Sequence, residues 1–184
     1  MSKLSVFNFI TLNGFYKGAN GDITWHKHGA EEGEFAAKNA SAGNTLLFGR
    51  ATYEMMAGFW PTQNAIDNMP GVAAGMNSSE KIVFSKTLKK ADWNNTTLIK
   101  DNIVEEIKKR KQSGGKDMTI LGSGSIVTLF ADHGLIDEYQ LMIDPVAIAA
   151  GTPIFNGLKH SLDLKLISTR TFSSGVILLI YHPV

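Results

Sequence analysis

The chain has 184 residues, 43% of them hydrophobic and 19% charged, and its formal net charge is +1. This length predicts one domain over residues 1–184, because domains commonly run to roughly 100–200 residues. A net charge near zero provides no broad positive field for nucleic acid, and the lack of cysteine excludes disulfides and thiolate metal sites. The amino terminus has no secretory-signal pattern and no apolar run approaches the roughly 20 residues that span a bilayer, so we expect a cytoplasmic protein without membrane contact.

Hydrophobic periodicity and helix-stop signals divide the chain into strands and helices that alternate through much of its length. The predicted elements are strand 4–11, helix 31–42, strand 45–48, helix 49–57, a short helix within 65–76, strands 81–84 and 96–99, helix 103–113, strand 117–121, helix 126–132, and three final strands within 135–144, 162–172 and 176–181. Asp101 is the expected N-cap of helix 103–113. Ser173-Ser174-Gly175 predicts a hairpin between the last two strands.

This order of elements predicts an α/β fold. Strand–helix–strand units favour parallel strands with helices on both faces, whereas consecutive strands at the end of a chain favour antiparallel pairing. We therefore expect a three-layer α/β/α domain with a mixed, mostly parallel central sheet and an antiparallel carboxyl-terminal hairpin.

Two junctions pass from a strand through glycine into a helix. One is Phe48-Gly49-Arg50-Ala51-Thr52, and the other is Leu121-Gly122-Ser123-Gly124-Ser125-Ile126. Glycine lets the backbone approach a ligand closely and helix N-termini attract phosphate, so two such junctions would hold the diphosphate of a dinucleotide from both sides. A Gly-x-Gly turn into a helix, taken alone, is more often a simple tight connection than a phosphate site, and neither junction carries the Gly-Lys-Ser or Gly-Lys-Thr sequence of nucleoside triphosphatases.

Arg50 and the turn Ser85-Lys86-Thr87 add cations and hydroxyl groups after two of the predicted strands. Groups of this kind bind phosphate at the carboxyl edge of a parallel sheet, where open α/β folds bind their ligands. The alternative interpretation is an exposed arginine and a polar turn. His26 and His28, on either side of Lys27, have no third ligand at a suitable spacing, so we expect no metal site.

A set of ordered blocks covers nearly the whole chain. The blocks are Thr11-Leu12-Asn13-Gly14-Phe15, Phe48-Gly49-Arg50-Ala51-Thr52-Tyr53-Glu54, Trp60-Pro61, Lys81-Ile82-Val83-Phe84-Ser85-Lys86-Thr87-Leu88, Leu121-Gly122-Ser123-Gly124-Ser125, and Pro145 followed after five residues by Gly151-Thr152-Pro153-Ile154-Phe155. Together they resemble the dihydrofolate reductase-like superfamily, and within it the reductase domain at the carboxyl end of bifunctional riboflavin-biosynthesis enzymes.

The resemblance implies an NADPH-dependent reductase of a pyrimidine- or pteridine-like ring, similar to 5-amino-6-(5-phosphoribosylamino)uracil reductase or dihydrofolate reductase. It assigns cofactor binding to Gly49, Arg50, Thr52, Ser85, Lys86, Thr87, Leu88, Gly122, Ser123, Gly124, Ser125 and Ile126, and substrate binding to Asn13, Trp25, Tyr53 and Pro145. It also implies a homodimer, for which strand 176–181 is the expected seam.

The chain departs from the family at Asn13, where the family usually has aspartate. An amide keeps hydrogen-bonding capacity but cannot ionise, so the sequence identifies no proton donor. Glu31, Glu32 and Glu34 lie on the helix that carries an acidic substrate ligand in dihydrofolate reductase, and we interpret them as a solvated helix face.

Three hypotheses follow from the sequence. The first is an NADPH-dependent reductase of a small heterocycle. The second is a dinucleotide-binding protein of the same fold without turnover, favoured by the Asn13 departure. The third is a phosphate- or partner-binding module in which the glycine junctions serve only as turns.

Overall fold

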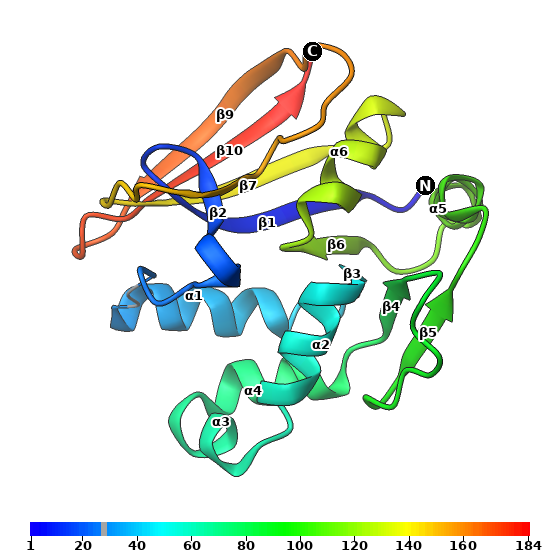
Figure 1. Cartoon of the computed structure of the whole chain (residues 1–184), viewed down its shortest axis with the longest axis horizontal. Coiled ribbons are helices and arrows are strands. Elements are labelled where there is room, and N and C mark those ends of the chain that lie inside the picture. The colour runs from blue at the N-terminus through cyan, green and yellow to red at the C-terminus, as the bar shows by residue number, and fades with distance from the viewer. Residues whose placement is uncertain (27–28) are drawn as a thin grey trace.

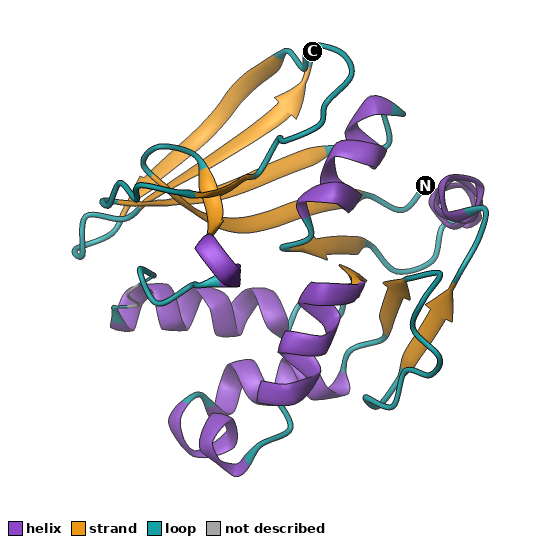
Figure 2. Cartoon of the chain, in the orientation of Figure 1, coloured by secondary structure: helices purple, strands orange, loops and turns teal. Residues whose placement is uncertain are grey.

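The computed structural model describes residues 1–26 and 29–184, and its elements follow the order expected from the sequence (Figure 1, Figure 2). The strands are β1 (Leu4–Thr11), β2 (Phe15–Gly18), β3 (Thr45–Gly49), β4 (Lys81–Phe84), β5 (Thr96–Ile99), β6 (Met118–Leu121), β7 (Glu138–Asp144), β8 (Gly151–Pro153), β9 (Leu164–Thr171) and β10 (Ile177–Pro183). The helices are the 3-10 turn η1 (Ala19–Gly21), α1 (Ala30–Ala40), α2 (Arg50–Phe59), α3 (Gln63–Asn68), α4 (Pro70–Ser78), α5 (Ile103–Ser113) and α6 (Gly124–Asp132).

Among the described residues, the main sheet has the strand order β5-β4-β3-β6-β1-β7-β10-β9. The strands from β5 to β7 run parallel, whereas β10 is antiparallel to both β7 and β9. The hairpin turn closes where the Phe172 N–H donates to the Val176 carbonyl oxygen at 2.9 Å. A mixed, mostly parallel sheet with an antiparallel carboxyl-terminal hairpin is therefore confirmed.

Helices cover both faces of this sheet because successive strand residues point to opposite sides. Leu47 and Ile82 pack with α5 and α6, whereas Leu46, Phe48 and Val83 pack with α2 and α4. Phe35 of α1 extends the second layer across Phe7. Figure 1 shows α1, α2 and α4 gathered on one side of the sheet. None of the helices within residues 1–26 and 29–184 combines the length and apolarity needed to span a membrane.

Two local predictions were wrong. The short helix expected within 65–76 is instead two helices, α3 and α4, which meet at Met69. Pro70 has no N–H to donate within a helix, so it starts α4 and ends α3 before it. Asp101 is not the N-cap of α5; that position is Asn102, in the left-handed conformation at φ 52°.

A small second sheet was not predicted. β2 pairs antiparallel with β8, which brings Gly18 opposite Gly151. A Cβ at Gly151 would lie 2.3 Å from the Lys17 carbonyl oxygen, so only glycine permits this backbone approach. Strands of three or four residues carry too little periodicity to be recognised in a sequence.

Candidate active site

The two glycine junctions follow neighbouring strands. β3 pairs in parallel with β6, so Gly49 at the end of β3 and Gly122 after β6 lie at the same edge of the sheet. The helices that follow pack on opposite faces, α2 against Phe48 and α6 against Leu47. The crevice formed where connections diverge in this way is the usual ligand site of open α/β sheets.

Hydrogen bonds join the junctions directly. The Gly49 N–H donates to Ser123 Oγ at 2.7 Å, and the Ser123 N–H donates to Thr52 Oγ1 at 3.2 Å. The sequence led us to expect that the nitrogen after Phe48 would be free for a diphosphate, and it is instead engaged, because the loops lie close enough to satisfy each other. In α6 the Ile126 N–H already donates to the Ser123 carbonyl oxygen at 2.8 Å. The backbone donors that a phosphate would meet are therefore the first amides of each helix, those of Arg50 and Ala51 in α2 and of Gly124 and Ser125 in α6.

Gly122 permits this close approach. Its φ is +58°, in the left-handed region that disfavours side chains, and a Cβ would lie 3.0 Å from Thr52 Cγ2. A larger residue would strain the loop and press on Thr52, which accepts the Ser123 N–H. Glycine therefore keeps the two junctions in contact.

A cleft of about 1200 Å³ opens beside the junctions, between the sheet and the layer of α1, α2 and α4. Its floor includes Ser5, Phe7, Phe9, Thr119, Leu121 and Gln140 of the central strands. Ligand pockets for small molecules usually have about 300–1000 Å³, so this cleft has room for a nucleotide and a second small molecule together.

The predicted cofactor residues fall into three groups. Those that line the cleft are Gly49, Arg50, Thr52, Gly122, Ser123 and Ser125. Gly124 and Ile126 are buried behind the α6 junction, where Gly124 faces Tyr16 and Ile126 joins the core. Ser85, Lys86, Thr87 and Leu88 are not among the described lining residues, but their turn adjoins Arg50.

Arg50 connects the first junction to that turn. Its Nε donates to Glu54 Oε1 at 3.0 Å, one helical turn later, and its Nη1 donates to Thr87 Oγ1 at 2.7 Å. The turn itself is organised by Ser85 Oγ, which accepts from the N–H groups of Thr87 and Leu88. The guanidinium and the hydroxyls thus form one exposed polar cluster at the mouth of the cleft.

Of the residues predicted to bind substrate, Trp25 lines the cleft and the other three lie elsewhere. Tyr53 is buried in the core, where its hydroxyl accepts the Trp93 N–H at 3.0 Å. The Asn13 amide donates to the Ile148 carbonyl oxygen at 2.8 Å and accepts from Thr11 Oγ1. Pro145 is exposed beside Gly175. Tyr53 and Asn13 thus make contacts that stabilise the fold around the cleft, and substrate binding by the four residues stays a prediction.

A histidine–carboxylate pair that the sequence did not predict adjoins the cleft. His26 Nδ1 lies 2.9 and 3.0 Å from the two carboxylate oxygens of Asp144, and both side chains are largely buried. The imidazole packs on Phe9 with the ring centroids 3.8 Å apart. Imidazole is the side chain most often used to transfer protons near neutral pH, so this pair can hold or pass a proton at the cleft wall. The metal pair considered for His26 included His28, which lies outside the described residues.

The three acidic residues of α1 have different environments. Glu34 is exposed and lines the cleft. Glu31 accepts the Ser173 N–H at 3.2 Å and Glu32, fully buried, contacts the Ser174 hydroxyl, so both face the β9–β10 hairpin. The interpretation of all three as a solvated face was therefore wrong for Glu32.

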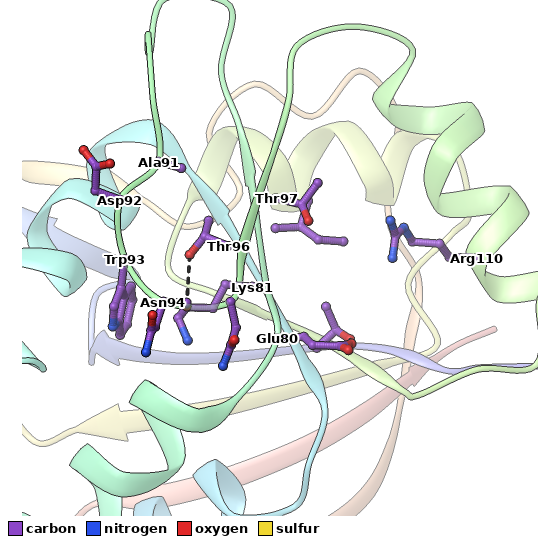
Figure 3. Close-up of a pocket in the computed structure, with 12 residues that line it drawn as sticks. Glu80, Lys81, Ala91, Asp92, Trp93, Asn94, Thr96, Thr97 and Arg110 are labelled. Atoms are coloured by element: carbon purple, nitrogen blue, oxygen red, sulfur yellow. Dashed lines mark hydrogen bonds between the residues drawn. The ribbon is translucent and has the colours of Figure 1, made fainter.

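A second, polar hollow of about 580 Å³ lies near the amino ends of β4 and β5 (Figure 3). Its most buried charged residue is Lys81, whose Nζ donates to the carbonyl oxygens of Met76, Asn77 and Ser79. Burial lowers the pKa of Lys81 to about 8, and the ammonium also lies 4.5 Å from the Trp93 ring centroid. These contacts engage Lys81 at the end of α4, so its role there is structural.

Comparison with known proteins agrees with this geometry. The family model described as the RibD C-terminal domain matches residues 2–178. The uncharacterized protein YyaP of Bacillus subtilis is 36% identical over 173 residues, which cover 94% of this chain and 90% of YyaP.

Two solved structures share the fold. A diaminohydroxyphosphoribosylaminopyrimidine deaminase/5-amino-6-(5-phosphoribosylamino)uracil reductase from Thermotoga maritima aligns with a TM-score of 0.71 at 14% identity, over 100% of this chain and 57% of that one. A dihydrofolate reductase from Enterococcus faecalis, complexed with NADP(H) and RAB-propyl, aligns with a TM-score of 0.64 at 20% identity, over 98% of this chain and 96% of that one. The expected dihydrofolate reductase-like fold is confirmed.

Proposed function

Because the chain belongs to the RibD C-terminal domain family, a family of reductases, we propose that it binds NADPH in the described cleft and reduces a small heterocyclic substrate. The observation that carries the proposal is the contact between the two glycine junctions, in which the Gly49 N–H donates to Ser123 Oγ at 2.7 Å. It places two helix N-termini at one mouth of a cleft that is large enough for a dinucleotide and a substrate together.

The residues at the junctions suit a dinucleotide. A Cβ at Gly49 would lie 3.3 to 3.5 Å from Ile126 and Ser123, and one at Gly122 would press on Thr52, so both glycines let the two junctions approach each other closely. First-turn amides, together with the hydroxyls of Thr52 and Ser125, would hold the diphosphate. When bound, the dihydronicotinamide would supply a hydride to the substrate.

Arg50 and the turn 85–88 support a preference for NADPH over NADH. The additional 2′-phosphate of NADPH requires additional positive charge and donors, and a guanidinium binds phosphate in forked geometry. Arg50 and Thr87 already contact each other at 2.7 Å, so both can act on one phosphate. Lys86, which is exposed and 3.7 Å from Asp101, adds a second cation nearby.

We propose His26 as the group that delivers the proton that accompanies the hydride. Asp144 orients the imidazole through Nδ1, and His26 lines the cleft at the end that also contains Trp25 and Phe9. The aromatic neighbours exclude water from that end and provide flat surfaces for a heterocycle. His26 would thus provide the proton donor that Asn13, an amide that cannot ionise, does not.

Fluorescence titration with NADPH and NADH tests the proposal. We expect NADPH to bind at micromolar concentration and more tightly than NADH, and a candidate substrate to lower the absorbance of bound NADPH. In the same assay His26→Gln should keep NADPH affinity and reduce kcat by roughly 10²-fold or more, the contribution of a general acid. Absence of NADPH binding at high micromolar concentration would refute the proposal.

A nucleotide-binding protein without turnover is the second candidate, and the engagement of Asn13 with Ile148 favours it. An amide used to tie down a loop takes no part in chemistry. On this alternative NADPH would bind, but its absorbance would stay constant with every pyrimidine or pteridine offered.

A further inference from the structure

The cleft extends well beyond the junctions along one face of α2. Among the lining residues, Met55 and Met56 lie three and four residues after Thr52, and Phe59 lies four and three residues after them, which places the four on one side of the helix. Thr52 touches the α6 junction through the Ser123 N–H, so the cofactor end and this extension are parts of one continuous cavity.

Apolar side chains line both walls of the extension, which we call the apolar arm. Its apolar lining residues are Met55, Met56, Phe59, Trp60, Met69, Pro70, Val72, Ala36, Ala37 and Ala40. The cleft lining also includes the asparagines Asn39, Asn44 and Asn68, of which Asn39 and Asn68 adjoin residues of the arm in the chain. The Trp60 indole N–H donates to Met56 Sδ at 3.0 Å, so even this polar group is turned toward a sulfur atom. Methionine and aromatic side chains form adaptable surfaces for flat apolar groups.

The charges around the cleft do not suit a phosphate in this arm. Among the lining residues in the described ranges, the charged or titratable side chains are Tyr16, Lys17, His26, Glu34 and Arg50. Tyr16 packs against Gly124 of the α6 junction, and Lys17 Nζ lies 5.4 Å from the Tyr16 ring centroid, so both belong to the cofactor end. Arg50 is bonded to Glu54 and Thr87 at the cofactor end, and His26 is bonded to Asp144. Glu34 lies on α1 one turn before Ala37 of the arm, and its carboxylate would repel an anion.

The arm also lies far from the N-terminus of α1, the end of the helix that attracts anions. Ala40 is ten residues after Ala30, which corresponds to about 15 Å along the helix axis. At this end α1 packs tightly on α4, since a Cβ at Gly75 would lie 2.6 Å from the Ala40 carbonyl oxygen. The wall is therefore rigid and closely packed.

We infer that the apolar arm binds an uncharged aromatic or alicyclic substituent of the substrate, and that this protein does not act on a ribose-phosphate compound of the kind named for the Thermotoga maritima reductase. A doubly charged phosphate placed there would lose its hydration and meet amide donors of Asn39, Asn68 and the first turn of α4, but no cationic side chain to neutralise its charge, which is unfavourable. The inference rests on the proposed function, since it takes the occupant of the arm to be part of the molecule that is reduced.

Two uracils with the same head group test the inference. 6-Benzylaminouracil carries an uncharged ring, and 6-ribosylaminouracil 5′-phosphate carries the charged alternative. We would measure the binding of each to the full chain by calorimetry, with and without NADPH. The benzyl compound should bind at least tenfold more tightly, a difference that burial of one ring accounts for.

Two matched lysine variants test whether the binding preference arises in the apolar arm. Met55→Lys puts a cation into the arm at a side chain that is 41% exposed, so the fold tolerates it, and Ile66→Lys makes the same change at a 42% exposed position of α3 outside the cleft lining. Met55→Lys should weaken the benzyl compound and strengthen the phosphate compound, each by about tenfold, and Ile66→Lys should change neither.

The outcomes distinguish a failure of this inference from a failure of the proposed function. Tighter binding of the phosphate compound, no measurable binding of the benzyl compound, or equal effects of the two lysine variants would overturn the inference. NADPH is titrated into the same samples. If NADPH fails to bind while the benzyl compound shows the expected preference, the reductase proposal fails and the preference of the arm stands.

Discussion

At the scale of single residues, we expect Arg50 to determine how much more tightly NADPH binds than NADH. Its guanidinium is about half exposed, paired with Glu54 and bonded to Thr87, so it is already oriented before any ligand arrives. An oriented guanidinium loses little rotamer freedom on binding a phosphate, which favours affinity.

Arg50→Gln should therefore weaken NADPH binding by roughly 10- to 100-fold, because a hydrogen bond to a charged group contributes about 1.5–3 kcal/mol. NADH, which has no 2′-phosphate, should bind the variant as it binds the native chain. Arg110→Gln is a suitable control, since Arg110 forms the same kind of i,i+4 pair, with Glu106, outside the cleft lining. Equal losses for NADPH and NADH would show that Arg50 does not read the 2′-phosphate.

At the scale of elements, the contact of α1 with α4 sets the width of the cleft. Both helices line it, and they approach most closely where Gly75 of α4 faces the Ala40 backbone. The atom nearest to a Cβ at Gly75 would be the Ala40 carbonyl oxygen, at 2.6 Å, so any side chain must push the helices apart.

Gly75→Ala should destabilise the protein by about 1–3 kcal/mol, the usual cost of overpacking. Gly58→Ala, in α2, should instead stabilise by about 0.5–1 kcal/mol, because that exposed position has open space and alanine favours a helix. Urea denaturation of both variants measures the difference. If Gly75→Ala stabilised the protein, α1 and α4 would move apart without a cost in free energy, and the prediction would be wrong.

At the scale of the whole molecule, the last two strands of the sheet are relevant to the oligomeric state. The expected seam, strand 176–181, is covered on both sides, because β10 lies between β7 and β9. The edge is β9, whose Leu166 and Ile167 are each 48% exposed. An exposed edge strand with apolar side chains readily pairs with another chain.

We therefore predict a homodimer formed through β9, with a native mass twice the 20.0 kDa of one chain. Replacing Leu166 and Ile167 together by lysine should give a single-chain mass in size-exclusion chromatography with light scattering, since like charges on an edge oppose pairing. Leu12→Lys, at an exposed residue of the turn after β1, should leave the mass unchanged. A monomeric native chain at high micromolar concentration would contradict the prediction.

The sequence by itself determined the elements that are fixed by local physics. Continuous apolar runs such as 46–48 and 82–84 became buried parallel strands, and glycine at 49 and 122 marked the turns into helices. The ordered blocks also identified the family, because they depend on residue types at known places in the chain.

Only the tertiary structure decided which of these residues meet. Asp144 is 118 residues from His26, so no spacing could reveal their contact. Tyr53 belongs to the same sequence block as Arg50, yet the helical rotation between them turns Tyr53 into the core and Arg50 to the cleft. The strand order, which makes β3 and β6 neighbours, is set by the packing of both sheet faces at once. The composition of the cleft follows from that order, because residues distant in sequence become neighbours only when the whole core is assembled.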